Sequence, residues 1–310
     1  MMQPGNRRAI YAALAANLGI AIAKLVGWAV TGAASMLAEA VHSFADTTNQ
    51  GLLLWGNAAS TRAGDASHAF GYGRERYFWA FIVALIIFSM GSVFAIHEGV
   101  NKLQHPHALT DPSVAISILI LGILLEGWSF RTAVREARPH KGSRSWWNFI
   151  HTTKSPELPV VLLEDFGALV GLVLALLGIS LAALTGESRF DAIGSISIGV
   201  LLGVIALILA YEMKSLLIGE SVRPEHEDLI RSCALAHPRV RRIIHLRTQH
   251  LSPDEILLGA KLEFEAGLSR EELSQAINQI ESEIREGLEG KAFIYIEPDL
   301  FDPEAVTDAT

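Results

Sequence analysis

The chain has 310 residues, 50% of them hydrophobic, and its mean hydropathy is +0.33. The apolar residues are clustered into long runs, which excludes an ordinary soluble domain and indicates a membrane protein. The net charge of −8 comes without any basic stripe, so we expect no nucleic-acid partner, and the single cysteine, Cys233, excludes both an intrachain disulfide framework and a cysteine-built zinc site.

Six apolar runs are long enough to cross a membrane, because a transmembrane helix needs about 20 residues. We expect the spans at residues 9–31, 35–58, 77–101, 112–134, 158–184 and 192–216. Two arginines precede the first run, as they do in a signal peptide. No convincing cleavage site precedes the next span, however, so we interpret this run as the first span.

Lys and Arg residues are concentrated on one side of the predicted membrane domain. The leader, the loop between spans two and three and the loop between spans four and five contain Arg7, Arg8, Arg62, Arg74, Arg76, Arg131, Arg135, Arg138, Lys141, Arg144 and Lys154. The opposite side contains only Lys102 and Arg189. The positive-inside rule therefore predicts that both termini are cytoplasmic. We expect an integral protein of the cell (inner) membrane.

From Glu220 onward the sequence resembles a small soluble domain. It predicts a helix that ends at Pro238, strands at 240–251 and 255–266, a helix after Ser269 and a third strand at 291–298. Ser269 and Glu272 have the spacing of a capping box at the start of the second helix. Helices and strands in this order indicate an α+β domain with its helices on one face of a sheet.

The expected fold class is thus an all-α six-helix transmembrane domain followed by a small α+β (αββαβ, ferredoxin-like) cytoplasmic domain. We expect the transmembrane domain at residues 1–218, the cytoplasmic domain at 219–303 and a flexible tail at 304–310.

Span two contains two metal-ligating residue types at helical spacing. His42 and Asp46 are four residues apart, which places them on one helix face at about 5–6 Å between Cβ atoms. Imidazole and carboxylate donors suit Zn²⁺ and also Mn²⁺, Fe²⁺ or Co²⁺. A polar pair that binds neighbouring helices is the alternative. Glu39, one turn earlier, is either a residue at the mouth of the site or, as we favour, a solvated acid at the helix end.

Span five contains two adjacent carboxylates, Glu164 and Asp165. Charged side chains inside a bilayer are costly and usually functional. Adjacent helical residues point about 100° apart, so we expect one to bind a cation and the other to face a neighbouring helix, a proton partner or water. The alternative is that span five starts later and both acids lie at the headgroups.

Several strings, taken together, resemble the cation diffusion facilitator family, over about residues 9–299. They are SMLAEAVHSFADTTNQ in span two, HAFGYGRERYFW before span three, VVLLEDFGALVG in span five and SLLIGESV after span six. The last two resemble the zinc-transporter-nine-like branch. The resemblance implies a metal-exporting transporter that is not an enzyme, exchanges a divalent metal for protons without an organic cofactor, and forms a homodimer whose tail domains touch.

The resemblance also implies a transport site with four ligands. His42, Asp46 and Asp165 match three of them, whereas the fourth position is Val161, which cannot bind metal. We expect Glu164 or water to replace the missing ligand, which makes the site richer in oxygen donors. Such a site favours Mn²⁺, Fe²⁺ and Co²⁺ more, relative to Zn²⁺, than the family's site does.

Two further metal sites of the family are incomplete in this sequence. In the loop after span two, Asp65 and His68 match two ligands and Tyr72 replaces the third, so we favour loop-capping roles. In the cytoplasmic domain, only His245 and Glu297 match ligand positions of the family. The other two ligand positions are occupied by Lys261 and Tyr295. Because the ammonium group of Lys261 repels a cation, we expect the cytoplasmic domain to lack the dinuclear metal site of the family.

The sequence therefore favours an exporter that moves divalent metal from the cytoplasm in exchange for protons, with the ion held between spans two and five. A membrane-anchored metal sensor and a proton-coupled exporter of organic cations are the alternatives. A membrane metalloprotease is disfavoured because the chain has no HExxH motif.

Overall fold

The computed structural model describes residues 4–288 and 290–302, with side chains described from Asn17 onward. The segment expected as a flexible tail, 304–310, lies outside the described residues. The chain divides into two compact units, Met1–Ser60 with Glu75–Lys214 and Thr61–Arg74 with Ser215–Thr310. A helical N-terminal part is thus followed by a smaller part that contains a sheet.

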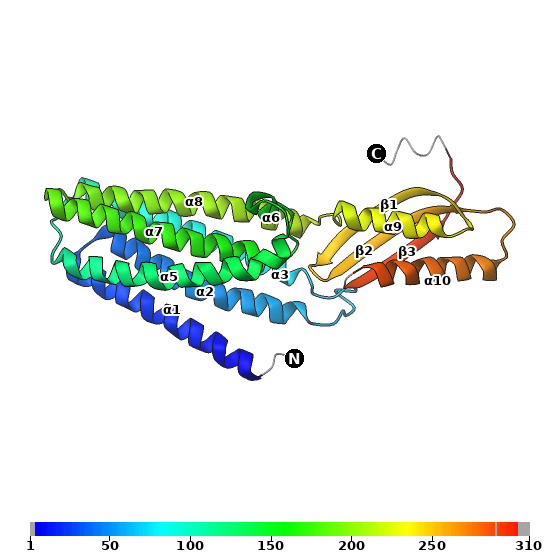
Figure 1. Cartoon of the computed structure of the whole chain (residues 1–310), viewed down its shortest axis with the longest axis horizontal. Helices are drawn as coiled ribbons and strands as arrows, with labels where there is room; N and C mark the ends of the chain where they lie inside the picture. The colour runs from blue at the N-terminus through cyan, green and yellow to red at the C-terminus, as the bar shows by residue number, and fades with distance from the viewer. Residues whose placement is uncertain (1–3, 289, 303–310) are drawn as a thin grey trace. The chain divides into compact units, whose positions relative to one another are not determined.

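The first unit consists of long helices that run alongside one another (Figure 1). In chain order they are α1 (Pro4–Thr31), α2 (Ala34–Ser60), α3 (Glu75–Ile86), a π-helical segment (Ile87–Val93), α4 (Phe94–Gln104), α5 (Pro112–Lys141), the short α6 (Trp146–Thr152), α7 (Glu157–Thr185) and α8 (Arg189–Ile218). Helix α7 packs against α2 and α5, and α1 packs against the same two helices.

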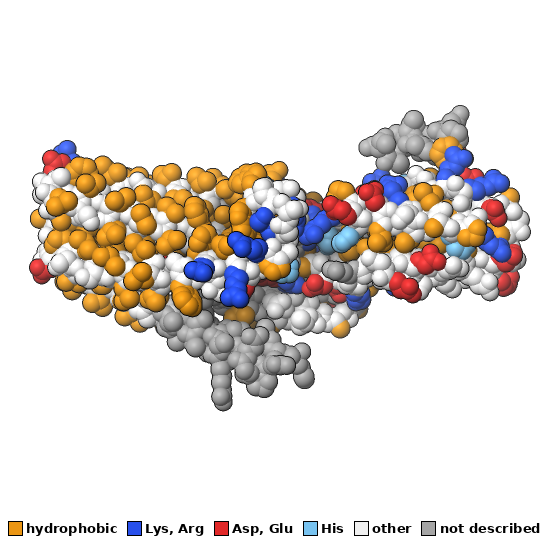
Figure 2. All heavy atoms as spheres, in the orientation of Figure 1, with side chains coloured by type: hydrophobic (Ala, Val, Ile, Leu, Met, Phe, Trp, Pro, Cys, Tyr) orange, Lys and Arg blue, Asp and Glu red, His pale blue; other side chains and the backbone are white. Residues whose placement is uncertain are grey.

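Four helices of the described part of the chain are long and apolar enough to cross a membrane. They are Glu75–Gln104, Pro112–Lys141, Glu157–Thr185 and Arg189–Ile218. The described segment Asn17–Thr31 is a shorter apolar helix. Hydrophobic side chains cover the visible face of this unit, and most of the Lys and Arg side chains on that face gather towards one end (Figure 2). Helices of this length and apolar composition indicate an integral membrane protein.

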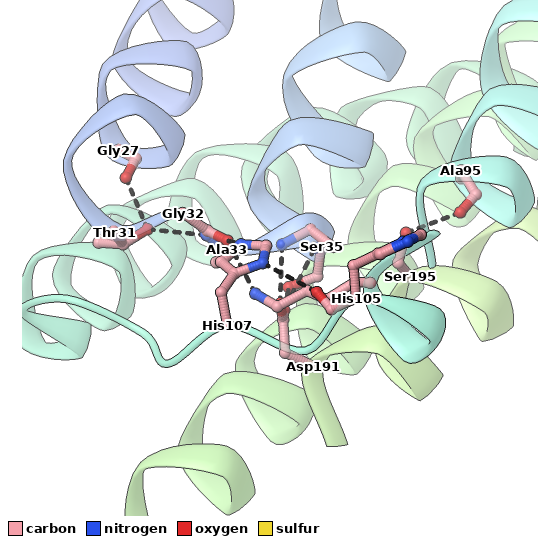
Figure 3. Close-up of polar contacts among 12 residues, drawn as sticks. Gly27, Thr31, Gly32, Ala33, Ser35, Ala95, His105, His107, Asp191 and Ser195 are labelled. Atoms are coloured by element: carbon pink, nitrogen blue, oxygen red, sulfur yellow. Dashed lines mark hydrogen bonds and ion pairs between the residues drawn. The ribbon is translucent and has the colours of Figure 1, made fainter. Parts of the chain in front are cut away.

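A buried ion pair fixes the start of α2. Asp191 of α8 accepts hydrogen bonds from the backbone N–H groups of Ala34 and Ser35, at 2.7 and 3.2 Å, and from the Ser35 hydroxyl (Figure 3). Lys102 of α4 donates to the same carboxylate at 2.7 Å and to the carbonyl of Gly32 at 2.7 Å. The carboxylate satisfies N–H groups that have no partner inside the helix. The helix that carries the candidate site is thereby tied to α4 and α8.

The second unit is built around a three-stranded sheet. Its elements are α9 (Pro224–Ala236), β1 (Val240–Ser252), β2 (Glu255–Phe264), α10 (Arg270–Gly287) and β3 (Lys291–Pro298). The strand order is β1-β2-β3, with β1 antiparallel and β3 parallel to β2. Alternate residues of β2 from Ile256 to Phe264 form a core with Ile230 of α9 and Ile280 of α10. The capping box predicted at Ser269 and Glu272 is confirmed.

The segment Thr61–Arg74 belongs to the second unit, although it connects two helices of the first. Its Phe70 ring contacts Phe293 of β3 edge-on, with the ring centroids 5.3 Å apart. The hydrophobic pattern of the sequence gives no sign of this association.

Candidate metal site

His42 and Asp46 lie on one face of α2, inside the helical unit. The imidazole Nδ1 of His42 is 3.4 Å from Oδ1 of Asp46, and the two side chains are 1% and 12% exposed. Neither ring nitrogen of His42, nor Oδ1 of Asp46, has a hydrogen-bond partner among the described residues. Buried polar atoms in proteins are nearly always satisfied, so three unsatisfied metal-ligating atoms at adjacent positions call for an explanation.

Glu164 of α7 faces α2. Its side chain is buried, and its Oε1 accepts a hydrogen bond of 2.7 Å from Nδ2 of Asn49. Asn49 lies three residues after Asp46, which places it on the same side of α2. Glu164 is thereby held against the helix that carries His42.

Asp165 faces a different helix from its neighbour. Its Oδ2 accepts a hydrogen bond of 2.9 Å from the hydroxyl of Ser129 on α5. The two adjacent carboxylates therefore point towards α2 and α5, as the 100° step of an α-helix requires.

A small cavity of about 20 Å³ lies where these helices meet. It is lined by Asn17, Ser43, Asp46, Gln50, Glu126, Ser129, Glu164 and Asp165. His42 is not among the lining residues. In the described part of the chain, no group of three or more His, Cys, Asp or Glu side chains is arranged so that it could hold a metal ion. The candidate ligands are therefore neighbours that have not converged on one point.

A second, larger cavity of about 580 Å³ lies between α2, α3, α5 and α7. It is lined by Gln50, Leu53, Leu54, Asn57, Arg76, His140, Ser155, Glu157, Leu158 and Val161. Gln50 lines both cavities. Arg76 holds the carboxylate of Glu157 through Nε at 2.6 Å and Nη2 at 3.0 Å. Val161 contributes only an apolar wall.

The expectation that Glu39 is a solvated acid is wrong. Its side chain is fully buried, and Nζ of Lys24 on α1 donates to its Oε2 at 2.9 Å. The same ammonium group donates to Oγ of Ser43 at 2.8 Å. A charge in the membrane interior needs a partner, and α1 supplies one here. The sequence-based interpretation omitted Lys24.

The loop residues Asp65 and His68 stabilise the loop itself. The carboxylate of Asp65 accepts hydrogen bonds from the Tyr72 hydroxyl at 2.7 Å and from the backbone N–H groups of Ser67 and His68 at 2.8 Å. The bond from Tyr72, followed by the two backbone bonds, lowers the pKa of Asp65 to about 2. His68 Nδ1 is 3.7 Å from the same carboxylate.

In the sheet unit, Lys261 lies between the two candidate ligands of the tail. It is opposite His245 on β1 and opposite Glu297 on β3. Its Nζ is 3.2 Å from Oε1 of Glu297 and 2.8 Å from Oδ2 of Asp299. These bonds, that to Asp299 first, raise the pKa of Lys261. Tyr295 and the two candidate ligands line the same groove, which therefore contains a fixed cation.

Sequence reasoning missed several buried polar residues. They are Lys24, Asn49, Lys102 and Asp191. Sequence reasoning also missed Glu126, which is half-buried and lines the small cavity. Each ionisable member of this set lies in an apolar helix, and such a residue is by itself a signal of function or of a buried pair. Its partner, however, is on another helix and cannot be deduced from spacing.

The chain belongs to the cation efflux family. The profile of the cation efflux transmembrane domain matches residues 10–218, and that of the cytoplasmic domain of cation efflux proteins matches residues 222–299. The family resemblance stated from the sequence is confirmed. The family consists of transporters and not of enzymes.

The chain is also similar in sequence to individual cation transporters. The proton-coupled zinc antiporter SLC30A9, mitochondrial, of Xenopus laevis is 31% identical over 288 residues, which are 90% of this chain and 52% of the relative. The human protein of the same name is 31% identical over 266 residues, covering 83% and 47%. The cation-efflux pump FieF of Escherichia coli (strain SMS-3-5 / SECEC) is 26% identical over 290 residues, covering 90% and 87%. The chain spans about half the length of the two SLC30A9 relatives, whose similarity supports the zinc-transporter-nine-like branch.

Proposed function

We propose that this member of the cation efflux family exports a divalent metal cation from the cytoplasm in exchange for protons. The observation that carries the proposal is the set of buried, unsatisfied donor atoms on His42 and Asp46, next to the buried carboxylate of Glu164. Neutral imidazole and ionised carboxylates are ligands of Zn²⁺, Mn²⁺, Fe²⁺ and Co²⁺. The names of two relatives, a zinc antiporter and a cation-efflux pump, point in the same direction.

The proposed ligands are His42, Asp46 and Glu164, with Asp165 as a further carboxylate at the cavity. Glu164 takes the place of the ligand that Val161 cannot supply, because it already faces α2 through Asn49. The absence of a converged metal cluster in the described residues fits a transport site, which must release its ion as well as bind it.

Proton coupling follows from the chemistry of these ligands. A metal ion displaces protons from imidazole and carboxyl groups when it binds, so its affinity falls as the proton concentration rises. Histidine titrates near pH 6.5 in water, within the range that a membrane pH gradient spans. Protons that reload the ligands from the more acidic side therefore promote release of the metal there.

We propose six membrane spans in a transport domain of residues 1–218, in a cell membrane and with both termini in the cytoplasm. The four long apolar helices supply four spans by their length, and α1, a helix of 28 residues that contains the apolar segment Asn17–Thr31, supplies a fifth. Helix α2 has 27 residues and supplies the sixth, although its polar residues reduce its hydropathy. The positions of Lys and Arg along the chain support the orientation.

The larger cavity is the proposed cytoplasmic access route. It is near the ends of α2 and α7 that adjoin the arginine-containing loops, and Gln50 lines both this cavity and the smaller one. The Arg76–Glu157 pair at its wall is partly exposed and is therefore available to hydrated ions.

We propose that residues 219–303 form an αββαβ domain that joins two chains into a homodimer, as expected of the cytoplasmic domain of this family. Its helices and strands follow in the order α9, β1, β2, α10, β3. The ammonium of Lys261 between His245 and Glu297 supports a tail without the dinuclear metal site.

The test is uptake into proteoliposomes with an imposed pH gradient, measured in turn for Zn²⁺, Mn²⁺, Fe²⁺ and Co²⁺. We expect uptake of at least one of them that depends on the gradient. Metal binding without movement would instead indicate a sensor. Movement of organic cations without any metal would indicate the other rival, an exporter of organic cations.

A further inference from the structure

Glu126 is a carboxylate on a third helix of the candidate site. It lies on α5, and it lines the small cavity together with Asp46 of α2 and with Glu164 and Asp165 of α7. Three helices thus contribute four carboxylate side chains to the lining of one cavity.

The cavity that these groups line is small. One water molecule needs about 10–15 Å³ of cavity volume. The cavity of about 20 Å³ therefore has room for one particle of the size of a water molecule. The acidic side chains of the described residues border this space without converging on one point. A dehydrated dication is smaller than a water molecule, and the cavity admits one ion rather than two.

An unsatisfied buried atom borders this cavity. Asp46 is buried and lines the cavity, and its Oδ1, which lies 3.4 Å from Nδ1 of His42, has no hydrogen-bond partner among the described residues. The buried ammonium of Lys24 is engaged with Glu39 and Ser43. An uncompensated carboxylate oxygen in a buried site is costly, and a bound cation removes that cost.

We propose that Glu126 supplies a carboxylate ligand to the transported dication. This inference rests on the proposed function and deepens it. With Glu126, the cavity offers carboxylates from α2, α5 and α7, in addition to Glu164 as the substitute for Val161. A site with more carboxylates favours Mn²⁺ and other oxygen-preferring ions relative to Zn²⁺. Glu126 is thus a residue that determines metal specificity.

The test compares Glu126→Gln with Glu136→Gln in the full-length protein. Glu136 is an exposed residue of the same helix, so its substitution makes the same change of charge away from the cavity. Binding of Mn²⁺ and Zn²⁺ is measured by calorimetry, and bound Co²⁺ by its visible absorption. Helicity and elution from a sizing column show that each variant is folded.

We expect Glu126→Gln to weaken Mn²⁺ binding roughly tenfold or more, since loss of even an outer partner of a metal ligand costs about 10–100-fold. Zn²⁺ binding should weaken less, the Co²⁺ absorption should change, and Glu126→Asp should restore part of the affinity. Glu136→Gln should match the wild type.

Two other outcomes are distinguishable. If the wild type binds metal and Glu126→Gln binds it equally well with the same Co²⁺ absorption, the role of Glu126 is refuted while the proposed function stands. If the wild type binds none of these metals, the proposed function itself fails. If Glu126→Gln does not fold, Glu126→Ala is measured in its place. A folded Glu126→Ala with the affinity and the Co²⁺ absorption of the wild type would overturn the assignment.

Discussion

The ammonium group of Lys24 lies 2.9 Å from Oε2 of Glu39, and both side chains are fully buried. The same group binds the hydroxyl of Ser43, which lines the small cavity. Glu39 and Ser43 are three residues before and one residue after His42. The ion pair therefore connects α1 to the part of α2 that carries the proposed ligands.

Lys24→Met should destabilise the protein strongly. Removal of one partner from a buried ion pair typically costs about 3–5 kcal/mol, because the other charge remains unpaired. The double variant Lys24→Met/Glu39→Gln should recover most of the loss. Thermal unfolding in detergent measures both variants, and Lys214→Met, at an exposed position of α8, is the control. A single variant as stable as the wild type would contradict the importance of the pair.

Asn49→Ala should weaken metal binding while the protein stays folded. Asn49 holds Glu164 towards α2 through a bond of 2.7 Å, and outer partners of metal ligands typically contribute about 10–100-fold to affinity. Calorimetry with Zn²⁺ and Mn²⁺ measures the effect. Thr48→Ala is the matched control, because Thr48 is the exposed neighbour and its hydroxyl binds only a backbone carbonyl of its own helix. Equal affinities in the two variants would remove Glu164 from the proposed ligand set.

The sequence predicts local features of this protein well. The spacing of His42 and Asp46 places both on one face of α2, and the step between Glu164 and Asp165 implies that they point to different neighbours. These conclusions need only the geometry of one helix. The capping box at Ser269 is local in the same way.

Features that depend on contacts between helices were not predictable. Glu39 resembles a helix-end acid until Lys24 of another helix is placed beside it, and the exposed face of a helix cannot be identified from a single apolar run. The same holds for Glu126, whose role depends on the cavity between α2, α5 and α7. The association of the loop 61–74 with β3 likewise depends on tertiary contacts.

The tail domain should bind no zinc. Lys261, whose pKa is raised by its bonds to Asp299 and Glu297, remains charged and repels a second cation in the groove. In the full-length variant His42→Ala/Asp46→Ala, we therefore expect no tightly bound Zn²⁺ after dialysis, measured by atomic absorption. One equivalent of zinc that persists in this variant, and that disappears with His245→Ala, would show that the tail holds a site after all.

Tyr72→Phe should raise the pKa of Asp65. The Tyr72 hydroxyl makes the largest contribution to lowering this pKa to about 2, and the backbone bonds from His68 and Ser67 contribute the rest. Because the folded pKa is lowered, the carboxylate stabilises the loop above the usual carboxyl range near pH 4, and this stabilisation is lost as the pH falls towards 2. Carbon-13 NMR titration of the carboxyl groups measures the shift, with Tyr295→Phe as a control. An unchanged pKa would show that the hydroxyl does not bind Asp65.

The central claim is that His42 and Asp46 hold the ion during exchange with protons. The most direct measurement follows metal uptake and internal pH together in proteoliposomes that are acidic inside, for the wild type, His42→Ala and Asp46→Ala. We predict that metal enters the wild-type vesicles while their interior becomes less acidic, and that both movements stop in each variant. Uptake by either folded variant at the wild-type rate, with the same change of internal pH, would contradict the account.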